Sequence, residues 1–213
     1  MNAPFPTRSK LTHHFVPGLR FDTNLEVLDT EGIWQPWFPE ESDCSLQIHS
    51  ISEWFVAQQA VRILTGQWPT LSEQVTAAPH PSPCAAWLQE QLPHHCVQEQ
   101  APQTNWPLAV QQCFDGGGMA LLCLALPGAV RWMLVPGIEV SGEQCLCSLL
   151  TLDPALPTPW ACGYNVRLSL AHPPVATPLR PDTLHPQVIY RTCDGNRLNA
   201  LVEKVLAITP QPT

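Results

Sequence analysis

Hydrophobic residues recur at helical spacing in the first half of the chain. From Leu46 to Thr65 the apolar positions return every third or fourth residue, as on one face of an α-helix, and Gly66 follows as a stop. Shorter helices are predicted over residues 83–92 and 105–118, the second of which ends in a run of glycines. We therefore expect the first half of the chain to be mainly helical.

The pattern changes after Gly118, where apolar runs are separated by short turns. The runs MALLCLAL, AVRWMLVPGIEV and QCLCSLLTL are punctuated by Pro-Gly and Ser-Gly-Glu, which is typical of an antiparallel meander. Residues 164–171 and 187–193 alternate in the same manner, and residues 21–28 form a further short strand. For residues 194–208 the pattern leaves a helix and a strand equally open.

Helices that precede a sheet of about four or five strands, instead of alternating with them, indicate an α+β chain. We expect a flexible N-terminal arm over residues 1–20 and a single domain over residues 21–213. The 24 prolines cluster at residues 77–84, 152–159 and 171–186, which we interpret as surface connections.

Composition excludes some classes of partner. The chain has 213 residues, 13% charged residues and a net charge of -8, so it lacks a basic surface for nucleic acid. No stretch approaches eighteen uninterrupted apolar residues, and the first residues lack the apolar run of a signal peptide. We expect a cytoplasmic protein that does not insert into membranes, and the sequence makes no prediction of its oligomeric state.

The nine cysteines are expected to be free thiols, and one of them occupies a position suited to chemistry. Cys44 comes just before the longest predicted helix, where Ser42 or Asp43 can serve as the N-cap. The positive end of a helix dipole lowers the pKa of a thiol from its usual value of about 8.5. Glu40, Glu41 and Asp43 oppose this effect because they are negative neighbours.

Three motifs in order resemble the C39-like, papain-fold cysteine peptidases. They are SDCSLQIHSISEWF around Cys44, Arg131-Trp132 before a Val-Pro-Gly-Ile turn, and a strand ending in Leu152-Asp153-Pro154. The resemblance covers roughly residues 35–165 and implies a papain-like fold, with an N-terminal helical half packed on a C-terminal antiparallel β-sheet. It also implies that Cys44 is the nucleophile and that Asp153 orients the catalytic base.

The departures from this family concern the remaining catalytic groups. Arg131 stands where the family has its catalytic histidine, and Phe38 stands where it has its oxyanion glutamine, so Gln35 is the nearest candidate for that role. A guanidinium group keeps its proton, so it cannot act as a general base. It can still pair with Asp153, in the bidentate geometry that arginine favours, or stabilise a thiolate.

Two functions therefore remain open. The first is a degenerate peptidase-like protein, a pseudoenzyme, that uses the ancestral substrate groove to bind a peptide or protein partner. The alternative is an active cysteine peptidase with Cys44 as nucleophile and a displaced general base, although no motif supports any of the candidate histidines, which are His49, His94, His95, His172 and His185.

Each candidate residue also has a purely structural interpretation. Cys44 can be a buried thiol, Asp153 an ordinary Asp-Pro turn, and Arg131 a strand arginine stacked beside a tryptophan. A zinc site that joins Cys145 and Cys147 to other residues lacks the paired spacing of structural zinc sites, so we predict no metal and no cofactor. The other residues considered for that site are Cys84, His94, His95 and Cys96.

Overall fold

The structure, a computed structural model, describes eight segments of the chain, which are residues 11–20, 26–36, 49–69, 84–101, 105–142, 145–157, 162–170 and 186–211. The helices in these segments are α1 (His49–Thr65), α3 (Cys84–Gln91) and α4 (Trp106–Asp115). The strands are β1 (Thr12–Phe15), β2 (Leu19–Arg20), β3 (Glu26–Leu28), β4 (Trp34–Pro36), β5 (His95–Gln100), β6 (Met119–Leu126), β7 (Ala129–Val140), β8 (Leu146–Leu152), β9 (Val166–Ser169), β10 (Gln187–Thr192) and β11 (Arg197–Pro210).

The second half of the chain closes into a barrel. Strands β6 to β11 pair antiparallel with their neighbours in chain order, and β11 then pairs with β6, so that six strands form a complete ring. The expected meander is therefore present, and it is closed rather than open. Closure removes the unpaired strand edges that an open sheet would expose.

The two long strands β7 and β11 each pair with three other strands. β7 pairs along Ala129–Val135 with β6 and along Gly137–Val140 with β1, while β8 lies on its other side. β11 pairs with β10 near its start and with β5 near its end, while β6 lies on its other side. Register shifts interrupt β7 between Leu134 and Gly137 and β11 between Val202 and Lys204, as bulges do at barrel bends.

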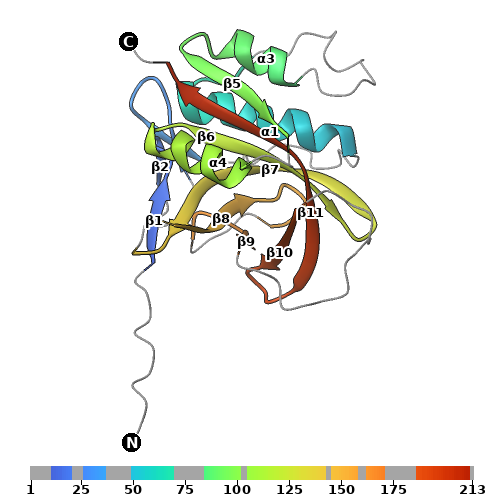
Figure 1. The fold of residues 1–213 in the computed structure, drawn as a ribbon. Coiled ribbons are helices and arrows are strands. Elements are labelled where there is room, and N and C mark those ends of the chain that lie inside the picture. The colour runs from blue at the N-terminus through green and yellow to red at the C-terminus, as the bar shows by residue number, and fades with distance from the viewer. Residues whose placement is uncertain are drawn as a thin grey trace, which may run out of the picture.

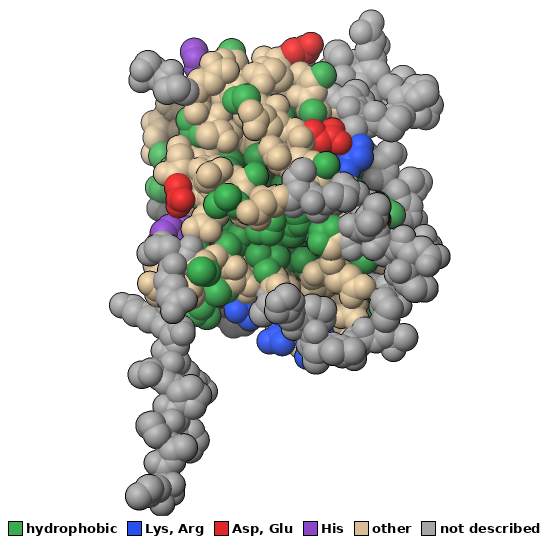
Figure 2. All heavy atoms as spheres, viewed as in Figure 1, with side chains coloured by type: hydrophobic (Ala, Val, Ile, Leu, Met, Phe, Trp, Pro, Cys, Tyr) green, Lys and Arg blue, Asp and Glu red, His purple; other side chains and the backbone are tan. Residues whose placement is uncertain are grey.

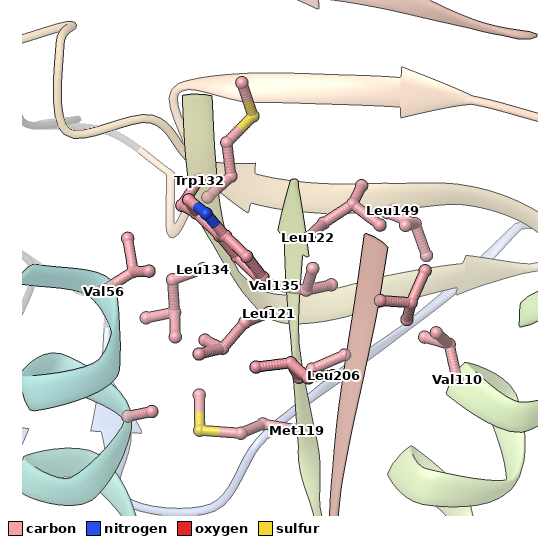
Figure 3. Close-up of a cluster of buried hydrophobic side chains, with 14 of the residues drawn as sticks. Val56, Val110, Met119, Leu121, Leu122, Trp132, Leu134, Val135, Leu149 and Leu206 are labelled. Carbon is pink, nitrogen blue, oxygen red and sulfur yellow. The ribbon is translucent and has the colours of Figure 1, made fainter. Parts of the chain in front are cut away.

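The core lies on both faces of β6, which explains its uninterrupted apolar sequence. Figure 3 shows Met119 and Leu121 of β6 next to Val56 of α1, while Leu122 points to the opposite side of the strand. Val110 of α4 lies on the other side of β6 and β11 from α1. A strand that is buried on both faces is apolar at every position instead of at alternate positions.

The three predicted helices are confirmed within a few residues at each end. Gly66 ends α1 with a φ of 73° and Gly117 follows α4 with a φ of 78°, a backbone conformation that suits glycine. Figure 1 shows α1 and α3 along one side of the barrel, with β5 between α3 and the end of β11. The segment over residues 194–208, left open between helix and strand, is a strand.

The predicted fold class was wrong. The chain is mostly β, with a closed barrel and three short helices in its described part, and it is not a helical half packed on a sheet. The N-terminal half also contributes strands to the main sheet, since β1 pairs with β7 and β5 pairs with β11. β5 was missed because its sequence, HCVQEQ, is polar and partly exposed and therefore lacks the pattern of a buried strand.

Two strands lie within the expected arm over residues 1–20, since residues 12–15 form β1 on the barrel and residues 19–20 form β2. A second sheet joins β2, β3 and β4, and it contains the predicted short strand near residue 27. Within the described segments, no helix combines the length and the hydropathy needed to cross a membrane.

Candidate functional site

One end of the barrel brings together three connections that are distant in sequence. The register pairs Thr151 of β8 with Val166 of β9, and Thr192 of β10 with the same Val166. The β6–β7 turn at residues 127–128, the chain after β8 and the β10–β11 turn at residues 193–196 therefore meet at this end. We call it the pocket end.

A pocket of about 280 Å³ opens at the pocket end. Apolar side chains and two arginines line it together. The lining residues are Leu126, Pro127, Ala129, Arg131, Leu156, Tyr190, Thr192, Asn196, Arg197 and Leu198. On the face drawn in Figure 2, hydrophobic side chains gather near the middle, and Lys and Arg side chains lie at the lower edge and, beside an acidic side chain, at the upper right.

Arg131 and Asp153 form an ion pair at the base of this site. Nη1 of Arg131 lies 3.0 Å from Oδ2 of Asp153, and the aspartate side chain is completely buried while 33% of the arginine side chain is exposed. The contact is end-on, through one nitrogen, instead of the bidentate pairing that we considered. The pair therefore joins a buried anion to a cation that faces the pocket.

Tyr190 and the backbone complete the shell around the Asp153 carboxylate. The Tyr190 hydroxyl donates to Oδ2 over 2.7 Å, and the backbone N–H of Ala155 donates to Oδ1 over 2.8 Å. The second contact closes an Asx turn after β8, so the structural interpretation of Asp153 as a turn residue also describes its geometry. Both carboxylate oxygens are thus engaged by donors of the protein itself.

Asn165 fixes the backbone of the same turn. Its side-chain oxygen accepts from the N–H of Asp153 over 2.7 Å, and its side-chain nitrogen donates to the carbonyls of Asp153 and Pro157. Since Asn165 is itself buried, these bonds hold the start of the β8–β9 connection against the barrel. We call Arg131, Asp153, Asn165 and Tyr190 the Asp153 network.

The Asp153 network does not change its charge near neutral pH through its tyrosine or its arginine. Burial, together with the neighbouring Asp153 carboxylate, raises the pKa of Tyr190 well above its ordinary value. A guanidinium group is charged under all conditions in which proteins fold. The guanidinium group of Arg131 therefore keeps its positive charge at the pocket, where the buried Asp153 carboxylate balances it, and the Tyr190 hydroxyl keeps its proton.

The structure brings together two of the four residues predicted for the site. Arg131 and Asp153 are in contact, whereas Gln35 lies on β4 in the second sheet and donates to Asp29 over 3.2 Å. Cys44 lies outside the described residues. The proposed roles of Cys44 as nucleophile and Gln35 as oxyanion donor stay predictions.

The described histidines do not supply a base to this pocket. No histidine is among its lining residues in the described part of the chain. His95 pairs with Pro210 at the far end of β11, while Arg197 of the same strand lines the pocket. His172 and His185 lie outside the described residues.

Sequence reasoning missed Tyr190, Asn165 and Arg197. A signal existed for Tyr190, since it is one of two tyrosines in the chain and sits in an alternating strand, where a buried hydroxyl needs a partner. Asn165 carried no comparable signal, because it follows a loop whose path depends on the closed barrel.

A second buried carboxylate, Glu139, lies on β7 and serves to attach β1. Arg167 donates to Oε2 of Glu139 over 2.6 Å, and Nε2 of His13 lies 3.0 Å from Oε1.

Across the segments that the structure describes, no three His, Cys, Asp or Glu side chains are grouped in a way that could hold a metal ion, so the zinc alternative finds no support there.

Comparison with known proteins adds no assignment: no family model matches the chain, and no curated protein matches its sequence significantly.

Proposed function

We propose that the protein binds a peptide segment of a partner protein at the pocket end and does not hydrolyse it. The observation that carries this proposal is the position of Arg131, which faces the pocket while a fully buried carboxylate holds it. An arginine held in this way is already oriented, so it loses little conformational entropy when it accepts a ligand.

The absence of a suitable base in the Asp153 network argues for binding instead of catalysis. General acid–base catalysis needs a group that gives and takes protons at the working pH. Arg131 cannot do so, and both oxygens of Asp153 already accept hydrogen bonds from Arg131, Tyr190 and Ala155. Kinship with the C39-like peptidases stays a prediction, and the binding role does not require it.

The size and chemistry of the pocket favour one amino-acid side chain beside a carboxylate. Its volume of about 280 Å³ is below the range of roughly 300–1,000 Å³ that is usual for small-molecule and cofactor sites. Leu126, Leu156 and Leu198 supply an apolar wall, and Arg131 and Arg197 supply the positive charge. We infer a ligand with an apolar side chain next to a carboxylate, either a peptide C-terminus or an acidic residue.

The expected strength of the minimal contact is modest. Burying one leucine-sized side chain is worth about 1.5–3 kcal/mol, and charge-assisted hydrogen bonds to a carboxylate are worth about 1.5–3 kcal/mol. The two gains add to about 3–6 kcal/mol and association costs at least about 4 kcal/mol, so a single residue should bind with a Kd of tens of millimolar or weaker, and a longer peptide should bind more tightly.

Calorimetric titration of short peptides tests the proposal. Peptides ending in leucine with a free carboxylate should bind at least about tenfold more tightly than the same peptides as amides, since about 1.4 kcal/mol is tenfold. Arg197→Gln should reduce this preference, because it removes one of the two positive charges at the pocket, and its exposed side chain leaves the fold intact. Arg191→Gln is the matched control, because Arg191 is the cross-strand neighbour of Arg197 but does not line the pocket.

Labelling of Cys44 separates binding from hydrolysis. A live nucleophile would react with a haloacetamide at pH 6 far faster than an ordinary thiol, because only the thiolate reacts. A protein that only binds should label at Cys44 no faster than at the exposed Cys145, and it should leave the bound peptides uncleaved. Rapid labelling of Cys44 together with peptide cleavage would overturn the proposal.

A further inference from the structure

Two cysteines lie side by side at the pocket end, although they are far apart in sequence. Cys162 precedes β9, and Cys193 begins the turn between β10 and β11. The antiparallel β9–β10 ladder continues past its last pair, since the N–H of Cys193 donates to the carbonyl of Asn165 over 3.2 Å. The closed barrel itself therefore sets the proximity of these two positions.

The two thiols share a hydrogen-bond acceptor. The Cys162 sulfur lies 3.1 Å from the carbonyl oxygen of Tyr164, and the Cys193 sulfur lies 3.5 Å from the same oxygen. Cys193 is exposed and Cys162 is partly exposed, so a dissolved reagent can reach the pair.

We propose that Cys162 and Cys193 form a reversible disulfide, which makes the pocket end a redox-sensitive site. Both residues are free cysteines in the structure. Buried thiols in the core, such as Cys84 and Cys113, lack the exposure that this exchange requires.

The reaction needs a small-molecule disulfide such as oxidised glutathione as its oxidant. The thiolate of one of the two cysteines attacks one sulfur of the oxidant, forms a mixed disulfide and releases one glutathione thiolate. The other cysteine then loses its proton and attacks the protein sulfur of the mixed disulfide, which forms the internal disulfide and releases the second glutathione thiolate. Two protein thiols and one oxidised glutathione thus become one protein disulfide and two reduced glutathiones.

The environment of Cys193 makes the exchange depend on pH. Burial, together with the neighbouring Cys162, raises the pKa of Cys193 to about 11. Only a thiolate attacks a disulfide, so oxidation of the pair should become faster as the pH rises.

The disulfide would tie the two connections that border the pocket. Cys193 lies next to Thr192 and near Asn196, both of which line the pocket. Cys162 lies three residues before Asn165, whose side chain hydrogen-bonds to the backbone of Asp153. Oxidation should therefore stiffen the pocket end. This inference rests on the cysteine geometry alone and does not depend on what the pocket binds.

Thiol mapping after equilibration with oxidised and reduced glutathione tests the proposal. The reduced protein has nine titratable thiols when unfolded, and the oxidised protein should have lost two of them. Cleavage after Trp160 separates Cys162 from Cys145 and Cys147. Mapping of the resulting peptides should show Cys193 linked to Cys162. The oxidised protein should also melt about 5–10 °C higher, and added dithiothreitol should reverse both changes.

Serine variants provide the controls. Cys162→Ser and Cys193→Ser should each abolish the loss of two thiols, whereas Cys145→Ser, at another exposed cysteine, should leave it unchanged. The proposal is overturned if the oxidised wild type keeps all its thiols, or if Cys162 and Cys193 both remain open to alkylation after oxidation. Unchanged peptide binding in the reduced serine variants would show that the two sites are separable.

Discussion

Replacing Asp153 with asparagine tests the network on which the pocket depends. The substitution keeps the size of the side chain and keeps Oδ1 as the acceptor for the N–H of Ala155. It removes the negative charge and places an NH₂ group where Oδ2 accepts from Arg131 and Tyr190. The tyrosine hydroxyl can rotate to accept a hydrogen bond, but the guanidinium group has only donors.

The magnitude follows from burial and from the hydrogen bonds that are lost. A charge-assisted hydrogen bond is worth about 1.5–3 kcal/mol, and breaking a fully buried ion pair costs about 3–5 kcal/mol. The Arg131 side chain is 33% exposed, so water replaces part of its lost partner, which lowers the expected cost. We expect Asp153→Asn to lower the free energy of unfolding by about 3 kcal/mol.

Urea unfolding followed by tryptophan fluorescence measures this change, since the chain has eight tryptophans. With a slope of about 2–3 kcal/mol per molar urea, the unfolding midpoint should fall by about 1–1.5 M. Asp115→Asn, at the exposed last residue of α4, is the matched control and should change stability by less than about 0.5 kcal/mol. If Asp153→Asn lowered the free energy of unfolding no more than this control does, the protein in solution would lack the ion pair between Asp153 and Arg131, and the reasoning would be refuted.

Two further predictions concern alkaline stability and the attachment of β1. The raised pKa of Tyr190 means that its proton stabilises the fold below about pH 10 and that this stability is lost at higher pH, by at most about 1.4 kcal/mol per unit. In a Tyr164→Phe variant, tyrosinate absorbance should therefore rise only as the protein unfolds, and a rise in the folded protein would contradict the buried hydroxyl. Gly137→Ala should loosen β1 and cost about 1–3 kcal/mol, because its Cβ would lie 2.5 Å from the Phe15 ring. Hydrogen exchange of the β1 amides should show this, whereas Gly142→Ala, which meets open space, should leave them protected.

Local patterns predicted most of the elements but not their assembly. The apolar spacing in α1 and the unbroken runs of β6 to β8 are strong local signals, and the glycines after α1 and α4 mark where those helices end. The closed barrel has no local signal, because it depends on bends in β7 and β11 that allow each strand to pair on both sides. The last strand was left open as helix or strand because Ala, Leu, Glu and Lys favour helices, and pairing with β6 overrode that preference.

The contact between Arg131 and Asp153 could be predicted, and the rest of the pocket could not. Two motifs on successive strands placed these residues at the same end of an antiparallel sheet, which requires no knowledge of the barrel. Tyr190 and Arg197 reach the same place only because β10 and β11 close the ring. A polar site shared by several strands therefore becomes visible only when the topology is known.

A titration of ¹⁵N-labelled protein with N-acetyl-leucine, followed by two-dimensional NMR, tests the central claim most directly. The proposed binding predicts shifts that grow with ligand concentration into the range of tens of millimolar and are concentrated at Leu156, Thr192, Asn196 and Leu198, and much weaker shifts with the uncharged N-acetyl-leucinamide. Equal shifts with both compounds, or shifts that avoid these residues, would contradict a carboxylate site at the pocket end.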